Sequence, residues 1–316
     1  MSRPRLHVIY RFSAAPNGKR RPSYFTQDLA LTSFARAIEQ IRADVQVTFL
    51  VDGHLPGSSA ELMRTLGEVV VGDWGSNRAS YLAQVRLMAT SVTADLVWFA
   101  EDDYLYQPRA FGSLLAAADA APEAAWFALS GPTRTGLLEA RVAQGPVAYA
   151  PLSRPGGVVD VDGIGWRRID STTSSFGART ATARSQRLLL RLCPGSGAAW
   201  DRTTCLAVQG LTPYPWRYIL SDLLVPSTPT RHRSSRIAWR LGSRLLVNVV
   251  AMALRRRGQS LIAPEAALIG HMDLPLEDDP ATWAAVATDT LAWSAQRYGR
   301  AVDPAEDQRE AWASED

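Results

Sequence analysis

The chain has 316 residues, of which 47% are hydrophobic and ten are tryptophan, so it can bury a large core and is not a disordered protein. Its net charge of +3 comes from 34 lysine and arginine residues, nearly all arginine, against 31 acids. This surplus suits anionic ligands such as nucleoside diphosphates but is too small to indicate nucleic acid. The two cysteines, Cys193 and Cys205, give neither a disulfide framework nor zinc-site spacing, so we expect a reducing, cytoplasmic setting.

No segment of the sequence predicts export or membrane insertion. The apolar run after residues 1–5 is too short for the core of a signal peptide. The longest apolar stretch elsewhere, 245–254, is about half the length that crosses a bilayer, and it includes Asn248. We therefore expect no transmembrane span, and peripheral contact with the inner face of a membrane stays open.

Predicted strands and helices alternate through residues 5–105. Short apolar runs predict buried strands at 6–10, 45–51, 68–71 and 96–100. Apolar residues at helical spacing predict helices at 26–41, 58–66 and 78–91. The alternation predicts a mostly parallel sheet with helices on both faces, and ligands bind such sheets at the carboxyl ends of the strands.

The rest of the chain is less regular. Further helices are predicted at 109–120, in the stretch that follows 169–179 and continues through residue 192, and at 280–298. Further strands are predicted at 125–130, 147–149 and 158–161. We interpret the region 131–165, which is rich in glycine and proline, as an excursion of the same domain.

Three consecutive acids, Glu101, Asp102 and Asp103, follow the fourth predicted strand directly. Buried like charges repel one another unless a cation or hydrogen-bond donors compensate them. Mg²⁺ prefers oxygen ligands and is commonly held by carboxylates together with substrate phosphates. The triplet is therefore a candidate site for a metal and a diphosphate, and an acidic turn that begins the next loop is the alternative.

Polar or turn-forming residues end the other predicted strands too, and together they carry a resemblance. They are Arg11, Val51-Asp52-Gly53, and Gly75-Ser76-Asn77-Arg78 at the start of a helix. With Trp98-Phe99-Ala100-Glu101-Asp102-Asp103, this order resembles the GT-A fold glycosyltransferases, particularly the family 2-like group. The resemblance covers residues 5–110 and extends loosely to residue 275.

The resemblance implies a fold and an organisation. The fold is α/β of the GT-A type, with a Rossmann-like, mostly parallel central sheet, helices on both faces and a C-terminal acceptor-side extension. Residues 1–130 would form the half that binds a nucleotide-sugar, 131–275 the acceptor-side half of the same domain, and 276–316 a C-terminal helix with an acidic tail.

The resemblance also implies a metal-dependent, hexosyltransferase-like glycosyltransferase. It would use Mn²⁺ or Mg²⁺ and a UDP- or GDP-type nucleotide-sugar, and it would invert the anomeric centre. The acceptor, a saccharide or a lipid-linked molecule, is not identified. Asp103 matches the metal-binding acid and Asp52 the acid that contacts base or ribose, while Glu101 or Asp102 would face ribose or donor sugar. The family's common motif is Asp-x-Asp, and here Glu101 replaces its first acid.

Several other residues are candidates for donor binding. Arg11 would contact the base or a phosphate, and Asn77 and Arg78 lie in the first turn of a helix at the expected site. Solvent-facing arginines are the alternative, and Arg86 on the same helix face is left as such. The hydroxyl-rich run 169–179 resembles a strand beside the donor sugar. Its candidates are Ser174, Ser175 and Arg179.

Asp201 and His271 are the candidates from the second half of the chain. Asp201 matches the catalytic carboxylate of inverting enzymes and would deprotonate the acceptor hydroxyl. Helix capping is the alternative for Asp201, and Asp222 is the substitute base. His271 resembles a C-terminal histidine that joins the metal in many enzymes of the family, with a structural histidine as the alternative. We interpret Asp160 and Asp162 as solvated turn acids.

A basic, amphipathic run at 230–258 leaves three interpretations open. Arg236, Arg240 and Arg244 repeat every four residues among apolar ones. A solvated helix face ranks first, a membrane or a lipid-linked acceptor second, and nucleic acid last. Two rival functions remain: a nucleotidyltransferase, for which the basic loop 16–22 is a weak signal, and a non-catalytic membrane-surface protein that uses this helix.

Overall fold

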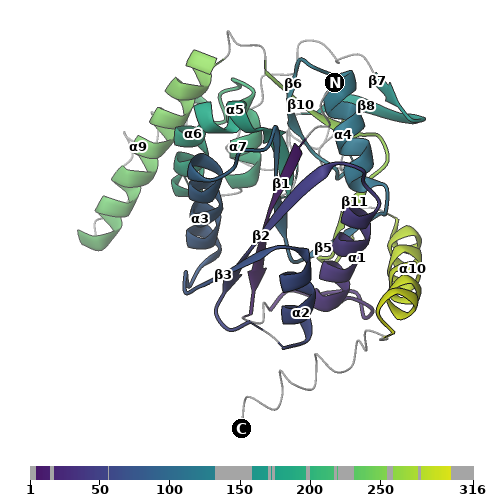
Figure 1. Ribbon diagram of the computed structural model, residues 1–316. Coiled ribbons are helices and arrows are strands. Elements are labelled where there is room, and N and C mark those ends of the chain that lie inside the picture. Colours follow the sequence, from purple (N-terminus) through teal and green to yellow (C-terminus); the bar gives the residue numbers. More distant parts are fainter. Residues whose placement is uncertain are drawn as a thin grey trace.

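A nine-stranded sheet with helices packed on both sides forms the centre of the computed structural model (Figure 1). The model describes residues 5–14, 18–55, 57–131, 159–169, 172, 175–196, 200–216, 219, 231–254, 259–276 and 279–299. In spatial order the strands are β3 (Glu68–Gly72), β2 (Asp44–Asp52), β1 (Arg5–Ser13), β4 (Leu96–Glu101), β9 (Phe176–Arg179), β6 (Ala124–Phe127), β10 (Ser260–Pro264), β8 (Ile164–Ile169) and β7 (Val159–Val161).

The sheet is mixed but mostly parallel, which confirms the predicted fold class. Strands β3, β2, β1 and β4 run parallel to one another. β9 lies antiparallel between β4 and β6, and β8 lies antiparallel between β10 and β7. A separate two-stranded sheet pairs β5 (Tyr104–Tyr106) with β11 (Ile269–His271).

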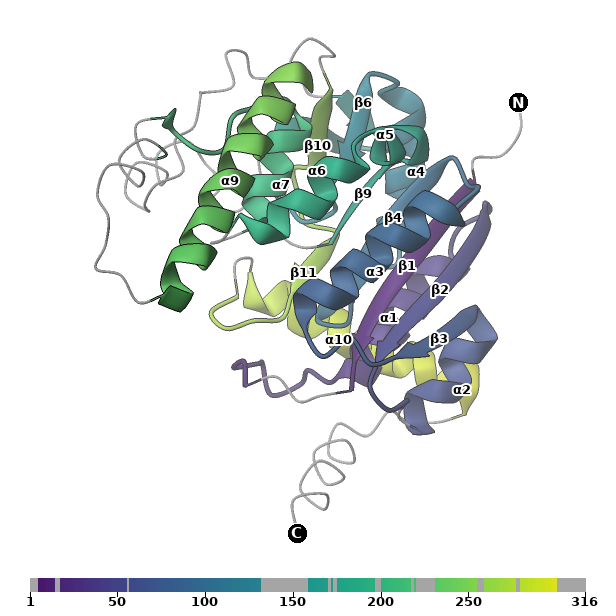
Figure 2. The same ribbon diagram turned by 90° about the vertical axis from the view of Figure 1, so that its left-hand side faces the viewer.

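Helices cover both faces of the sheet (Figures 1 and 2). One face packs against α1 (Gln27–Glu39), α2 (Gly57–Leu66) and α4 (Ala110–Ala120). The other packs against α3 (Asn77–Thr90), α5 (Thr180–Ser185), α6 (Arg187–Leu192), the short helix η3 (Cys193–Gly195), α7 (Trp200–Val208) and α9 (Arg231–Leu254). The last helix, α10 (Pro280–Tyr298), lies beside α1.

Alternation along β1 explains why both faces are buried. Leu6, Val8 and Tyr10 belong to the core cluster under α1 and α4, whereas Ile9 belongs to the cluster under α3. Successive side chains of a strand point to opposite faces, so a strand covered on both sides consists of a continuous apolar run. The predicted strands of the first half are such runs, and each of them forms a strand in the structure.

A third core cluster attaches α10 to the N-terminal half. Trp283 of α10 is 1% exposed and shares this cluster with Leu29 of α1, Leu105 of β5 and Met272 directly after β11. The C-terminal helix therefore packs where the small β5–β11 sheet meets α1.

Along the part of α9 whose side chains the structure describes, residues 238–254, one face of the helix contacts the rest of the molecule. Leu241, Val247 and Ala251 are buried, and the buried Asn248 bonds the backbone of Tyr214, accepting from its N–H at 3.2 Å and donating to its carbonyl at 2.6 Å. Arg244 is half-buried and donates to the Ser196 carbonyl at 3.1 Å. The opposite face exposes large apolar side chains. These are Trp239, Leu245, Leu246, Val249 and Met252.

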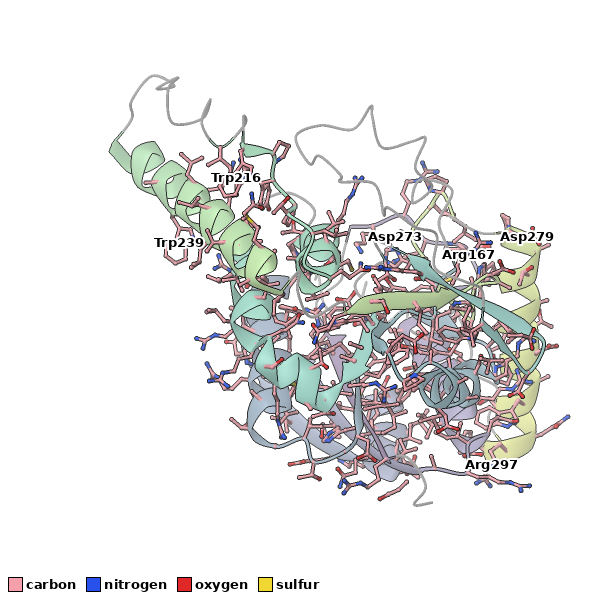
Figure 3. All side chains as sticks on the ribbon, turned by 90° about the horizontal axis from the view of Figure 1, so that it is seen from above. Arg167, Trp216, Trp239, Asp273, Asp279 and Arg297 are labelled. Atoms are coloured by element: carbon pink, nitrogen blue, oxygen red, sulfur yellow. The ribbon has the colours of Figure 1, made fainter. Side chains whose placement is uncertain are left out.

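The exposed side chains among residues 238–254 are thus mainly apolar, and the interpretation of the whole run 230–258 as a solvated helix face stays a prediction. Trp239 is the most exposed of these side chains at 61%, and it lies on the α9 side of the molecule together with Trp216 (Figure 3). None of the described helices combines the length and the hydropathy that a membrane span requires.

The sequence does not predict β5, β8, β10 or β11 as strands, and the helical run through residue 192 is divided at Gln186 into α5 and α6. The predicted strand at 147–149 and most of the region 131–165 lie outside the described residues.

Candidate metal and nucleotide site

The carboxyl ends of the parallel strands meet at one edge of the sheet and bring the predicted polar residues together. In the register of β1 with its neighbours, Ser13 pairs with Asp52 of β2 and Arg11 pairs with Glu101 of β4. The acidic triplet therefore begins beside the end of β1. This is the arrangement expected for a ligand site in an open parallel sheet.

Arg11 binds both Glu101 and Asn77. The Arg11 guanidinium is 8% exposed, forms an ion pair with Glu101, and donates to the Asn77 carbonyl and to Ser80 Oγ, both at 2.9 Å. Asn77 Oδ1 accepts a further hydrogen bond from the same guanidinium. This buried pair joins β1 and β4 to the first turn of α3, and a contact of these residues with a nucleotide stays a prediction.

Asp102 points back into the protein. Its Oδ2 atom accepts from the Ser13 backbone N–H at 2.8 Å and from Gln27 Nε2 at 2.7 Å. Burial, reinforced by the neighbouring Asp103 charge, raises the pKa of Asp102 to about 6. Asp102 therefore fixes the end of β1 against α1.

Asp103 lies beside His271 because β5 and β11 pair. The pairing places Tyr104 opposite His271, and the Met272 N–H donates to the Asp103 carbonyl at 3.0 Å. His271 Nε2 consequently lies 3.2 Å from Asp103 Oδ2, and its ring stacks on Tyr104 with centroids 4.8 Å apart. Asp273 follows two residues later, with its Oδ2 atom 3.3 Å from His271 Nε2.

Two cations from the segment after β1 neutralise these acids. Lys19 Nζ lies 3.2 Å from Asp103 Oδ2 and 2.8 Å from Asp273 Oδ2. Arg21 lies 3.1 Å from Asp103 Oδ2 and 2.5 Å from Asp273 Oδ1. Although burial opposes it, hydrogen bonding to His271 and the charges of Lys19 and Arg21 hold the pKa of Asp103 well below its usual range.

The donor set of this cluster fits a divalent metal. One ligand atom each from Asp103, His271 and Asp273 lies within 4.8 Å of the others. Two carboxylates and an imidazole suit Mn²⁺ or Mg²⁺. In addition, the buried Oδ1 atom of Asp103 has no hydrogen-bond partner among the described residues. Such an atom is costly unless something binds it.

Asp52 holds the turn between β3 and α3. Its Oδ1 atom accepts from the backbone N–H groups of Trp74 at 2.7 Å and Gly75 at 3.2 Å. Gly75 has a φ of +62°, a conformation that glycine adopts readily. Ser76 then caps α3 by accepting from the Ala79 N–H at 3.2 Å. Contact of Asp52 with a base or ribose stays a prediction.

The remaining donor and base candidates lie around this edge at different depths. Arg78 is exposed, and its guanidinium lies close to Gly195. A Cβ added to that glycine would be 3.3 Å from Arg78 Nη2. Ser175 is fully buried just before β9. Arg179 donates to the carbonyls of Ala118 at 2.7 Å and Ala124 at 2.8 Å, so it attaches β9 to the end of α4.

Asp201 lies in the first turn of α7, next to Trp200, whose ring packs on Tyr81 of α3 with centroids 4.5 Å apart. Burial raises the pKa of Tyr81, and the Asp201 carboxylate adds to this effect. Asp201 is thus near the α3 side of the site. Ser174 and Asp222 lie outside the described residues.

Three residues of the cluster are absent from the sequence-based candidates. Asp273 is separated from His271 by one residue, a spacing that could have indicated a second ligand on the same side of a strand. Lys19 and Arg21 are part of the basic loop that the sequence connects only with a nucleotidyltransferase. Their approach to Asp103 depends on tertiary structure, so no local pattern indicates it.

No protein-family model matches the sequence, and no curated protein matches it. Solved structures similar to the chain include TarS 1-349 from S. aureus, with a TM-score of 0.40, 11% identity, and coverage of 77% of this chain and 72% of that one. Another is glucosyl-3-phosphoglycerate synthase from Mycobacterium tuberculosis in complex with Mn²⁺ and UDP (0.36, 9%, 78% and 80%). A third is the inositol-1-phosphate CTP transferase from T. maritima (0.41, 10%, 90% and 95%).

Glycosyltransferases of the GT-A type are therefore among the solved structures that the chain resembles, as the sequence predicts, and nucleotidyltransferases are among them as well. At these TM-scores the likeness assigns no activity.

Proposed function

We propose that the protein is a glycosyltransferase that moves a sugar from a nucleoside-diphosphate donor to an acceptor hydroxyl with the help of Mn²⁺ or Mg²⁺. The observation that carries this proposal is the Asp103–His271–Asp273 cluster at the carboxyl ends of the parallel strands. Its members come from segments 168 residues apart, yet backbone pairing of β5 with β11 places them side by side. The motif resemblance of residues 5–110 supports the same reading.

The residues around the cluster would divide the work. Asp103, His271 and Asp273 would hold the metal, which when bound supplies positive charge against the departing diphosphate. Asp52 would bind base or ribose through the carboxylate oxygen that does not accept from the turn. The start of α3, with Asn77 and Arg78, would favour a phosphate through its free N–H groups and dipole.

Asp201 would act as the general base. A base must come within hydrogen-bond reach of the acceptor hydroxyl, and Asp201 lies in the first turn of α7, next to the Trp200 ring that packs on Tyr81 of α3. In this proposal the carboxylate takes the hydroxyl proton while the acceptor oxygen attacks the sugar, which inverts the anomeric centre. Glu101, Asp102 and Ser175 would shape the donor pocket from within through their buried contacts.

A nucleotidyltransferase is the second candidate. Lys19 and Arg21 follow β1 and lie at the carboxylates, and a basic loop after the first strand is what this class would use for phosphates. The two reactions differ in their products. A glycosyltransferase transfers the sugar of a nucleotide-sugar and releases a nucleoside diphosphate. A nucleotidyltransferase instead joins a nucleoside triphosphate to a sugar phosphate and releases pyrophosphate from the triphosphate.

Calorimetry with a panel of UDP- and GDP-sugars and CTP, with and without Mn²⁺, tests the proposal. We expect at least one nucleotide-sugar to bind only with Mn²⁺, and Asp103→Asn to weaken this binding by more than about 100-fold, since a direct ligand matters more than an outer one. Asp160→Asn is the control, because Asp160 is exposed and, among the described residues, accepts from Gly163 of its own turn. Absence of metal-dependent binding to any nucleotide-sugar would refute the proposal. Release of pyrophosphate from CTP would favour the nucleotidyltransferase.

We further propose that α9 contacts an anionic membrane surface, where a lipid-linked acceptor would be reached. Its exposed face is apolar and the helix contains no acid, while the exposed Arg240 lies at helical spacing from Arg244 and Val247, on the side of α9 that faces the protein. An amphipathic helix with apolar residues and arginines binds at the boundary between headgroups and acyl chains. The net charge of +3 and the absence of acids on α9 favour anionic lipid over a second copy of the same basic chain.

A further inference from the structure

Lys19 occupies the position between the two carboxylates of the metal cluster. Its Nζ atom lies within 3.2 Å of oxygens from both Asp103 and Asp273, and His271 Nε2 lies 3.2 and 3.3 Å from the same two oxygens. A divalent cation bound by this set would need one oxygen atom of each acid, and Lys19 already binds one oxygen atom of each. The ammonium and the metal therefore compete for one place.

The charges of the cluster balance before any ligand binds. Asp103 and Asp273 supply two negative charges, and Lys19 and Arg21 supply two positive ones. A divalent metal adds two positive charges and would leave the cluster with an excess. The diphosphate of a nucleotide-sugar carries two negative charges, so the site is balanced again only when metal and diphosphate are both present.

Lys19 and Arg21 are held with different firmness. The Arg21 side chain is 14% exposed and lies over the Phe25 ring, 5.2 Å from its centroid. The Lys19 side chain is 46% exposed and binds the carboxylates of Asp103 and Asp273. It is also the single lysine of a chain that otherwise uses arginine. A compact ammonium on a flexible stem leaves a carboxylate pair more readily than a stacked, planar guanidinium does.

We propose that Lys19 is an exchangeable counter-ion of this site: together with Arg21 it neutralises Asp103 and Asp273 until a divalent cation binds, and it then binds the donor diphosphate. Lys19 moves from the carboxylates to the phosphate oxygens, while Arg21 stays over the Phe25 ring and faces the diphosphate from there. Metal and diphosphate consequently bind with positive cooperativity, because each removes the charge imbalance that the other creates. The diphosphate step rests on the proposed function, while the competition with metal does not.

Because the chain has one lysine, selective ¹⁵N-lysine labelling gives one side-chain NMR signal. We expect Mg²⁺ alone to move this signal toward that of a solvated lysine, and UDP added to the Mg²⁺ complex to move it again. A Lys19 signal that does not respond to Mg²⁺ overturns the competition. A signal that responds to Mg²⁺ but not to UDP overturns the diphosphate step.

Mn²⁺ calorimetry on variants gives the second measurement. Lys19→Ala should bind Mn²⁺ about tenfold more tightly than the wild type, since it removes a competitor, and should bind UDP about tenfold more weakly at saturating Mn²⁺. Arg21→Ala should weaken UDP similarly. Arg20→Ala is the matched control, because it removes the same charge from an exposed position in the same segment.

Equal Mn²⁺ affinity of Lys19→Ala and Arg20→Ala overturns the proposal. Tighter Mn²⁺ binding without any turnover of nucleotide-sugars would instead sustain the competition and refute the glycosyltransferase assignment, so the two failures are distinguishable.

Discussion

At the scale of single residues, three adjacent acids have three different environments. Glu101 is the counter-ion of the buried Arg11, Asp102 accepts two neutral hydrogen bonds, and Asp103 faces cations. Their pKa values therefore diverge, with Asp102 raised to about 6 and Asp103 lowered. Alternation of side chains and the turn after β4 separate the roles that the sequence alone presents as one cluster.

His7 should make the stability of the fold depend on pH. Its Nε2 atom lies 2.9 Å from Thr48 Oγ1 inside the sheet, and burial, partly opposed by Glu68, lowers its pKa. The unfolded chain then binds a proton that the folded chain does not, so the free energy of unfolding falls as the pH decreases from about 7 to about 5. His7→Gln should flatten this dependence in urea titrations.

The exposed His54 provides the matched control for this measurement. His54→Gln should leave the slope of stability against pH as in the wild type. An equal change of slope in both variants would contradict the role of burial at His7.

At the scale of elements, the β5–β11 sheet determines where the candidate metal ligands lie. Gly270 in the middle of β11 lies so close to α10 that a Cβ on it would be 2.3 to 2.6 Å from atoms of the Trp283 ring. The approach of strand and helix thus requires glycine at this position. A small strand of three residues is positioned by its contact with a tryptophan rather than by its own length.

Gly270→Ala should therefore displace β11. We expect a loss of about 1–3 kcal/mol in the free energy of unfolding, as for overpacked cores, together with weaker Mn²⁺ binding. Urea titration and calorimetry measure the two effects. Gly242→Ala on α9 is the control, because a Cβ there meets nothing within 4 Å and alanine favours a helix. Unchanged Mn²⁺ affinity in Gly270→Ala would separate β11 from the metal site.

The exposed face of α9 gives a prediction about lipid. The protein should co-sediment with vesicles that contain phosphatidylglycerol and not with purely zwitterionic ones, and Leu245→Glu should reduce this binding about tenfold by placing a charge on the apolar face. Val71→Glu replaces an exposed apolar residue at the far edge of the sheet and should have no effect. If Leu245→Glu still bound the vesicles as the wild type does, a membrane contact would be contradicted. The same holds if the wild type self-associated and Leu245→Glu abolished this self-association.

At the scale of the whole molecule, the C-terminal helix is a structural partner of the N-terminal half. Trp283 is buried against residues of α1 and β5. Trp283→Ala should lower the free energy of unfolding by about 3–5 kcal/mol, the range for large buried aromatic residues. Trp293→Ala on the same helix should cost less, because Trp293 is half-buried and its ring packs on Tyr298. Equal losses in chemical denaturation would contradict this account.

The sequence predicts the parallel half of the fold well and the site in part. Apolar runs such as 96–100 and helical stripes such as 78–91 are local signals, and the structure has a strand and a helix there. The family resemblance indicates His271 as a partner of Asp103, and the two side chains lie 3.2 Å apart. Asp273, Lys19 and the strand β5 escape prediction because their positions depend on pairing between distant segments, which leaves no periodic signal in the sequence.

The pairing of β11 with β5 also determines when the site can exist. A chain is synthesised from its N-terminus, and its early segments can fold while later ones are still being added. A ribosome-bound chain that ends before residue 269 contains Asp103 and Lys19 but neither His271 nor Asp273. Such an unfinished chain holds no complete candidate metal site, so binding of the donor would require that β11 has been synthesised and has paired with β5.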